Sequence, residues 1–565
     1  MSRKRSRFFS MVNGIFVITF LLLLFPVLSG NVGLTKASAA GASEINSDFN
    51  GDGLEDLAIG IPGEGIGSLF GTGAVSVIYG ASGGLKASSP ADQFWHQNSP
   101  GVEDASEQGS FRHSEQFGSS LAAGDFNNDG KDDLAIGVPG ETIGTLIEAG
   151  AVHVLYGSSS GLQTSSPADQ FWHQNSQSIL NEAEEGDRFG TSLVAGDFNG
   201  DGYHDLAIGV PGESIGSVDR AGAVNVIFGS SSGLRATASG TTPNDQFWHQ
   251  GKPGVEDVEE SSDEFGSSLT SGDFNGDGKD DLAVGALFEG IGAVDSAGSV
   301  NVLYGSSSGL QTTSPADQFW HQNSPDIDNS VERFDSFGWD LATGDFNEDG
   351  FDDLAIGVPS EDTGRTNNGV VHVLYGSSSG LQTSSPADQF WHQNSPGVED
   401  APEYADRFGS SLAAGDFNND GFDDLAIGAA GEAIFGASIS GAGAVNVLYG
   451  SSSGLQTSSP ADQFWHQNSP GVEDTPEADK DSFSDRLASA LAAGDFNNDG
   501  YFDLAIGVPG EGTPEPTDAQ GAVQILYGSS SGLQTSSPAD QFWYQDTPGV
   551  EDIAEVGDQF GSSLA

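Results

Sequence analysis

Residues 125–133 read DFNNDGKDD, and a stretch with the same pattern occurs seven times along the chain. Each copy has Asp at its first position, Asn at its third, Asp at its fifth, Gly at its sixth and Asp at its ninth. In a tight loop alternate side chains turn inward, so we expect three carboxylates and one amide oxygen to converge. Because hard oxygen ligands without His or Cys suit Ca²⁺ better than zinc or copper, the pattern predicts a calcium loop.

The predicted ligands are the side chains of the first, third, fifth and ninth residues and the carbonyl oxygen of the seventh. They are Asp48, Asn50, Asp52, Leu54, Asp56, Asp125, Asn127, Asp129, Lys131, Asp133, Asp197, Asn199, Asp201, Tyr203, Asp205, Asp273, Asn275, Asp277, Lys279, Asp281, Asp345, Asn347, Asp349, Phe351, Asp353, Asp416, Asn418, Asp420, Phe422, Asp424, Asp495, Asn497, Asp499, Tyr501 and Asp503. We therefore expect up to seven structural Ca²⁺ ions as the cofactor.

The loop is not an EF-hand, because the twelfth position of the second copy is Ile136 and the DLAIGVP that follows has the pattern of a strand and not of an amphipathic helix. The alternative is a polar turn in which Asp and Asn serve turn chemistry alone. Repulsion argues against that alternative, because two carboxylates roughly 4 Å apart repel by about 4 kcal/mol at an effective dielectric constant of about 20.

The composition limits the class of partner. The chain has 565 residues with 18 Lys+Arg against 82 Asp+Glu, a net charge of −64, and no Cys. Such a charge repels nucleic acid and anionic membranes and attracts cations, so we expect no nucleic-acid partner. The absence of Cys excludes disulfides and thiol chemistry. Hydrophobic residues make up 36% of the chain and lie in periodic runs, which predicts a folded core.

The first 39 residues have the pattern of a secretory signal peptide. A basic start, MSRKRSR, precedes an apolar run over Ile15–Leu28 and a small-residue site at Ala37–Ala39. The alternative is an uncleaved membrane anchor, although Pro26 interrupts the run. No later segment is apolar for 18 residues, so we expect no membrane span after cleavage and a secreted, extracellular or cell-surface protein over residues 40–565.

The elements that position the loops belong to one repeated unit, because the loops start 71 to 79 residues apart. Around the second loop, we expect strands over Phe117–Ala123, Asp133–Pro139, Gly150–Gly157 and Asp169–Gln174. These runs are short, rich in β-branched and aromatic residues, and bounded by Gly, Pro, Ser and Asp. Four antiparallel strands in each radially repeated unit predict an all-β fold, a seven-bladed β-propeller.

The ends of the chain complement each other in this pattern. No Phe-Gly run precedes the first loop, whereas the C-terminus ends with such a run at Phe560–Ala565. We therefore expect the C-terminal strand to be the innermost strand of the first blade and to close the ring. The alternative is a fragment that stops at the start of an eighth unit.

These residues resemble FG-GAP repeats, the units of the integrin α-subunit head. The Phe-Gly pairs begin at Phe117, Phe189, Phe265, Phe337, Phe408 and Phe560, and Gly-x-Pro triplets begin at Gly60, Gly137, Gly209, Gly357 and Gly507. The resemblance implies a seven-bladed propeller with calcium in the loops and often a role in adhesion. Unit seven departs from it with Leu487-Ala488 in place of Phe-Gly, and units four and six lack the Pro.

The topology predicts two different faces. The calcium loops and the Ser-rich GSSSGL turns share one face and are nearly uniform. The other face carries varied loops, such as 141–149, 212–220 and 511–520, and acidic linkers such as 101–116. Varied loops on a rigid scaffold suggest recognition, although drift without function is the alternative.

We therefore expect a non-enzymatic, exported, monomeric binding or adhesion module whose partner is an extracellular protein or glycan. A GSSSG turn such as 157–161 fits a nucleophile elbow, but a turn and not a helix follows it. One alternative is a carbohydrate-active or other enzyme with its site on the central face opposite the calcium loops. A further alternative is a surface-layer or matrix protein without a specific ligand.

Overall fold

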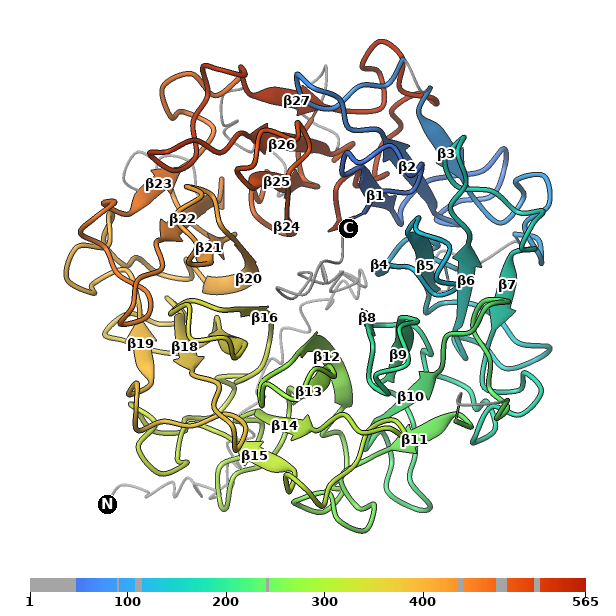
Figure 1. Cartoon of the computed structure of the whole chain (residues 1–565), viewed down its shortest axis with the longest axis horizontal. Coiled ribbons are helices and arrows are strands. Elements are labelled where there is room, and N and C mark those ends of the chain that lie inside the picture. The colour runs from blue at the N-terminus through green and yellow to red at the C-terminus, as the bar shows by residue number, and fades with distance from the viewer. Residues whose placement is uncertain are drawn as a thin grey trace, which may run out of the picture. The chain divides into compact units, whose positions relative to one another are not determined.

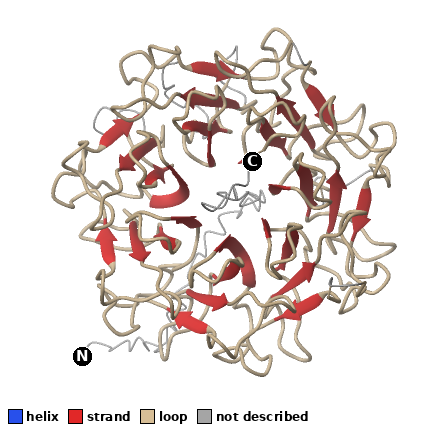
Figure 2. Ribbon diagram, in the orientation of Figure 1, coloured by secondary structure: helices blue, strands red, loops and turns tan. Residues whose placement is uncertain are grey.

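The computed structural model describes residues 47–88, 91–106, 114–239, 243–434, 441–473, 485–512 and 519–565. The predicted signal peptide, residues 1–39, lies outside these residues. The described residues form 28 strands and no helix, and the strands make seven four-stranded antiparallel sheets arranged in a ring (Figures 1 and 2). This confirms the all-β, seven-bladed propeller. No described segment is a helix capable of spanning a bilayer.

Each blade is numbered by the order of its second strand in the chain, and its strands run from the centre of the ring outward (Figure 1). The strands are, for blade 1, β28 (Ser563–Leu564), β1 (Leu57–Ile61), β2 (Ala74–Ile78) and β3 (Gln93–Trp95); for blade 2, β4 (Leu121–Gly124), β5 (Asp133–Val138), β6 (Ala151–Leu155) and β7 (Gln170–Trp172); for blade 3, β8 (Leu193–Gly196), β9 (Asp205–Val210), β10 (Ala223–Ile227) and β11 (Gln246–Trp248); for blade 4, β12 (Phe265–Gly272), β13 (Asp281–Ala286), β14 (Ser299–Leu303) and β15 (Gln318–Trp320); for blade 5, β16 (Leu341–Gly344), β17 (Asp353–Val358), β18 (Val370–Leu374) and β19 (Gln389–Trp391); for blade 6, β20 (Phe408–Gly415), β21 (Asp424–Ala429), β22 (Ala444–Leu448) and β23 (Gln463–Trp465); and for blade 7, β24 (Leu491–Gly494), β25 (Asp503–Val508), β26 (Ala522–Leu526) and β27 (Gln541–Trp543).

The C-terminal strand β28 closes the ring, as the sequence predicted. It pairs antiparallel with β1, so that Ile59 lies opposite Leu564. The backbone N–H of Ala58 donates to the carbonyl of Ala565 at 2.7 Å, and the N–H of Ala565 donates back at 3.0 Å. Blade 1 is therefore built from both ends of the described chain.

The innermost strands begin later than the sequence predicted in most blades. We expected a strand from Phe117, but β4 begins at Leu121. Phe117 instead forms a parallel bridge with Gly73 of the preceding blade, and Gly118 has φ = 87°. Phe117 thus bridges to the neighbouring blade, whereas Gly118 still donates its N–H to the carbonyl of Gly137 in its own blade at 3.1 Å. Only β12 and β20 include the pair, and both contain a bulge there.

The glycine of the Gly-x-Pro triplet lies where two blades meet most closely. A Cβ added to Gly60 would lie 2.0 Å from the Oγ of Ser563 and 2.2 Å from the carbonyl of Gly118. The Ser563 hydroxyl donates to that carbonyl at 2.7 Å. Only glycine leaves room for this contact, which joins blade 1 to blade 2 and brings the two parts of the repeat motif together.

The core lies between neighbouring blades. One cluster joins Val75 and Val77 of blade 1 with Leu134 and Ile136 of blade 2, all fully buried, and Trp95 packs against it. Every residue of β5 is buried, which explains why this second strand is apolar on both faces. Because the hydrophobic effect is the largest favourable term in folding, the blades stabilise one another mainly through these shared clusters.

Candidate metal centres

The seven predicted calcium loops are the hairpins between the innermost and second strands. In blade 2 the loop runs from the end of β4 at Gly124 to the start of β5 at Asp133. The carbonyl of Phe49, in the blade 1 loop, accepts a hydrogen bond of 3.1 Å from the N–H of Ser158, in the blade 2 Ser-rich turn. Loops and turns therefore share one face, as predicted, which we call the hairpin face. The opposite face, with the other loops and linkers, is the linker face.

The first Asp of each loop organises the turn. Its carboxylate in blade 2, Asp125, accepts hydrogen bonds from the N–H groups of Asp129 at 3.0 Å and Gly130 at 2.8 Å. Gly130 has φ = 81°, a left-handed conformation that favours glycine at this sharp bend. The fifth residue also accepts a backbone N–H within the loop, from a residue nearer in the sequence. The Asp52 carboxylate accepts the N–H of Leu54, two residues on, at 3.1 Å.

The ninth Asp and the third Asn of each loop lie together at the buried end of the hairpin. The Asp133 carboxylate accepts hydrogen bonds from the Asn127 side-chain amide at 3.0 Å and from the N–H groups of Phe126 at 3.1 Å and Gly157 at 2.8 Å. Asp133 is fully buried. Burial raises the pKa of the equivalent Asp353 to about 9. The structure thus brings the predicted third and ninth ligands into contact.

The chemistry of the donors fits a hard cation. Each hairpin offers three carboxylates, one side-chain amide and a carbonyl at the seventh residue, with no His or Cys among the five positions. In two hairpins the seventh residue also supplies a positive charge, because Lys131 pairs with Asp129 and Lys279 pairs with Asp277, both at 3.0 Å. In these two hairpins the seventh residue therefore contributes through its side chain as well as its backbone.

The eighth residue of the loop, which sequence reasoning passed over, links neighbouring hairpins. The Asp132 carboxylate accepts the N–H of Asp48 in the preceding blade at 3.1 Å, and Asp280 accepts that of Asp197 at 2.7 Å. Its equivalents Glu55, His204, Asp352 and Asp423 accept in the same way. The available signal was an acceptor side chain at this position in six copies, with Phe502 in the seventh.

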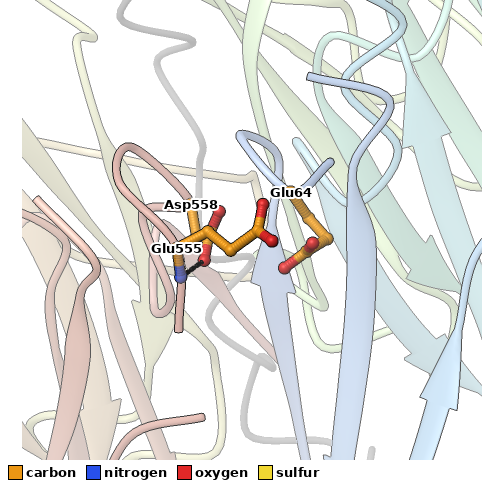
Figure 3. Close-up of side chains that lie close together, drawn as sticks. All are labelled: Glu64, Glu555 and Asp558. Atoms are coloured by element: carbon orange, nitrogen blue, oxygen red, sulfur yellow. Dashed lines mark hydrogen bonds between the residues drawn. The ribbon is translucent and has the colours of Figure 1, made fainter. Parts of the chain in front are cut away.

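Sequence reasoning also missed carboxylate clusters on the linker face. Glu64 follows β1, and Glu555 and Asp558 precede β28, so the three belong to one blade (Figure 3). Each offers an oxygen within 4.8 Å of the others. Burial, together with the charges of Asp558 and Asp552, raises the pKa of Glu64 to about 8.

The same arrangement occurs in three other blades. The members are Glu260, Asp263 and Glu289 in blade 4, Glu332, Asp335 and Glu361 in blade 5, and Glu403, Asp406 and Glu432 in blade 6. The sequence signal was a Glu-x-x-Asp pair ending two residues before Phe-Gly, followed by a Glu four residues after the glycine that begins Gly-x-Pro or its counterpart. We name these four groups the linker clusters.

The comparisons with known proteins agree with the repeat structure. The family model described as FG-GAP repeat matches residues 40–78, 117–155, 189–227, 265–303, 337–374, 408–448 and 487–526. These segments run from the Phe-Gly pair or its equivalent through the hairpin to the third strand of each blade, except that the first segment begins at residue 40, ahead of the first loop.

Two relatives share part of the chain. The chain is similar to phosphatidylinositol-glycan-specific phospholipase D of Rattus norvegicus, 38% identical over 29% of this chain and 18% of that protein. It is also similar to integrin alpha pat-2 of Caenorhabditis briggsae, 29% identical over 45% of this chain and 18% of that protein. The matches thus span less than a fifth of either relative.

One solved structure, exotype rhamnogalacturonan lyase YesX, aligns over 71% of this chain and 62% of that chain, with 10% identity and a TM-score of 0.32. A TM-score this low supports no inference about function.

Proposed function

Because the chain belongs to the FG-GAP repeat proteins and folds into a propeller of seven such repeats, we propose that it is an exported calcium-binding module that recognises a protein or glycan outside the cell. In this proposal calcium is structural and occupies the hairpins, and the ligand binds the linker face. The catalytic alternative is not proposed, because the phospholipase match covers only 18% of that enzyme.

The distribution of exposed apolar side chains carries the proposal. Among the described residues, every large hydrophobic side chain that is prominently exposed belongs to a loop or linker of the linker face. They are Phe70, Leu180, Val258, Phe334, Tyr404, Ile553 and Val556. Exposed apolar and aromatic residues are typical of protein or glycan contact sites. In so acidic a chain, their confinement to one face supports recognition there.

The loops of this face divide into a uniform and a varied part. In blades 2, 3 and 4, the loop after the second strand makes the same small turn, with paired backbone hydrogen bonds at Ile143–Leu146, Ile215–Val218 and Ile291–Val294. Loops 141–149 and 212–220 are therefore alike in this turn, although we expected them to differ. In blade 5, a side chain holds the loop instead, because the Asn368 amide oxygen accepts the N–H of Thr363 at 3.0 Å. We expect specificity to come from the varied sector that begins at blade 5, part of whose loops, residues 435–440 and 513–518, lies outside the described residues.

Calcium contributes to recognition indirectly in this proposal. The hairpins lie on the opposite face, and their eighth residues already tie each blade to its neighbour. A cation in each hairpin offsets the repulsion of its three carboxylates, so the ring that carries the ligand loops becomes rigid. Similarity to an integrin α chain supports a role in adhesion, although it covers 45% of this chain.

The test is a glycan and matrix-protein array probed with the labelled full chain, once in millimolar Ca²⁺ and once in chelator. We expect binding to at least one ligand class in Ca²⁺ and a loss of binding in chelator. The matched variants are Tyr404→Ser and Phe334→Ser on the linker face, with Phe422→Ser on the hairpin face as control. Binding that the control weakens and the linker-face variants leave unchanged would place the ligand on the wrong face for this proposal.

A further inference from the structure

The proposed function assigns no role to the carboxylates of the linker clusters. We propose that each of the four is a second type of calcium site, on the face opposite the hairpins, where Ca²⁺ ties the linker that enters a blade to the loop that follows its second strand. This proposal is independent of the hairpin sites, because no residue is shared between the two sets.

Each cluster joins two segments of one blade. In blade 1, Glu555 and Asp558 come from the linker before β28, and Glu64 comes from the loop after β1 (Figure 3). The N–H of Glu555 donates to the Asp558 carboxylate, which fixes the two linker carboxylates side by side. Glu64 and Asp558 are buried, and Glu555 is exposed, so the cluster opens to solvent on one side.

A further polar side chain lies near the cluster in two blades. Asp400 acts on the pKa of Glu432 in blade 6, and Asn329 acts on the pKa of Glu361 in blade 5. Both residues have positive φ, 79° in each case. The two Glu and one Asp of each cluster are hard oxygen donors of the kind that Ca²⁺ takes.

Each cluster also lies beside a buried amide oxygen without a hydrogen-bond partner, a feature that Gln97 and Gln174 show beside blades 2 and 3 as well. In each of the four blades, a Gln that lies two residues after the outer strand of the preceding blade donates its side-chain N–H to the buried Glu, as Gln545 does to Glu64 at 2.6 Å. The oxygen of the same amide is buried and has no hydrogen-bond partner in Gln545, Gln250, Gln322 and Gln393, whose side chains are at most 1% exposed. It lies beside the Glu carboxylate because both amide atoms share one carbon.

Within the blade 6 cluster, one carboxylate oxygen is itself unsatisfied. Asp406 is fully buried, and one of its oxygens accepts the N–H of Glu403, whereas the other has no partner. A buried carboxylate oxygen beside two further carboxylates needs a cation, a proton or a hydrogen-bond donor. The charged groups that most affect the pKa of Glu64 and Glu289 are all carboxylates.

The test counts bound metal in the full chain. We would equilibrate the protein with millimolar CaCl2 by dialysis and measure calcium per chain by atomic emission. The variant replaces the most accessible Glu of each cluster, with Glu260→Gln, Glu332→Gln, Glu403→Gln and Glu555→Gln in one chain. Because these side chains are exposed or partly exposed, we expect the variant to fold and to bind four fewer ions than the parent.

The matched control removes the same charge elsewhere on the linker face, at the exposed residues Glu103, Glu182, Glu185 and Glu551, each changed to Gln. We expect the control to bind as many ions as the parent. An equal count in the cluster variant and the control overturns the proposal, and the ions that remain then belong to the hairpins. A parent that binds four ions and a cluster variant that binds none would support these sites while refuting the hairpin sites.

Discussion

The two faces of the ring place their carboxylates in different surroundings. On the hairpin face, three N–H groups of the protein, from Phe126, Asn127 and Gly157, surround Asp133. On the linker face, Glu64 accepts N–H groups from Gln545 and Gly65, and it lies beside two other carboxylates. Hydrogen bonds therefore offset the negative charge of Asp133 more fully than that of Glu64. From this comparison we expect the carboxylates of the two faces to differ in how far they depend on a cation.

Removing calcium should have the largest effect, because it acts on both faces together. An ion present at roughly ten times its Kd stabilises the folded state by about 1.4 kcal/mol, and seven hairpins alone multiply that gain. We expect chelator to lower the Tm by more than about 10 °C in differential scanning calorimetry. Mg²⁺ at the same concentration is the control and should restore only a small part of the shift. If the melting curves with and without calcium coincide, neither the hairpins nor the linker clusters bind calcium.

Replacing the ninth residue of a hairpin should have the next largest effect, and it should persist without calcium. Asp133→Ala leaves three buried donors without their acceptor, and each costs about 1 to 3 kcal/mol. We expect a loss of roughly 3 to 6 kcal/mol in urea unfolding measured in chelator. The control is Asp129→Ala in the same loop, whose carboxylate is exposed and pairs with Lys131. If Asp133→Ala loses as little stability in chelator as Asp129→Ala, Asp133 stabilises the protein only through a metal.

Sequence alone predicted the ring and the positions of the hairpins, because both follow from local patterns repeated seven times. For turn residues such as Gly130 and apolar strands such as β5, the residue types alone predict the local conformation. The inter-blade contact of Asp132 with Asp48 was not predictable from one loop, because its partner lies in the preceding repeat. Nothing local predicts the Glu64 cluster, since its three members meet only after β28 has closed the first blade.

The Phe-Gly pair shows the same limit within a predicted element. Its apolar, β-favouring pattern suggested that the strand continues back to Phe117, but Phe117 forms a bridge with Gly73 of another blade instead. In blade 7, Leu487 makes the equivalent bridge to Gly443, and Ala488 adopts φ = 68° where the other blades have Gly. The position thus requires a buried apolar side chain followed by a left-handed residue, a tertiary demand that strand propensity does not report.

Removing one carboxylate from a linker cluster should stabilise the protein without calcium and reduce its stabilisation by calcium. This change of sign sharpens the contrast between the faces. Glu332→Gln removes one carboxylate from a cluster with Asp335 and Glu361. Without calcium, relief of repulsion should stabilise the protein by about 1.5 kcal/mol, between the values for two charges in water and at a protein surface. With calcium, the variant should lose part of the stabilisation that calcium gives the parent.

The measurement for Glu332→Gln is the Tm in chelator and in millimolar Ca²⁺. The exposed Glu182, changed to Gln, is the control and should shift neither value. A Glu332→Gln variant that is less stable than the parent in chelator would show that the cluster is satisfied by hydrogen bonds and not strained by charge.

The smallest effect on stability at neutral pH is expected at His153, because the residue at the equivalent position in another blade is hydrogen-bonded to a linker. His153 in β6 is fully buried between Phe117 and Phe171, and neither ring nitrogen has a hydrogen-bond partner. The equivalent Asn225 of blade 3 donates its amide to the carbonyl of Leu180 in a linker at 3.0 Å. His153→Asn should gain the matching bond to the carbonyl of Glu103 and stabilise the protein by about 1 kcal/mol at pH 7.

Acid should enlarge the effect of His153→Asn. Burial lowers the pKa of His153 to about 3, from 6.5 for the exposed group, so the folded state holds it neutral while the unfolded state takes up a proton. Stability is therefore complete above about pH 6.5 and falls toward pH 3, by about 2 kcal/mol between pH 7 and pH 5. The variant should lack this share of the decline in urea unfolding at the two pH values. The partly buried His173 in the outer strand is the control, and His173→Asn should leave most of the decline in place. If His153→Asn and the parent lose the same stability on acidification, acid sensitivity lies in the carboxylates of the two faces and not in the strands between them.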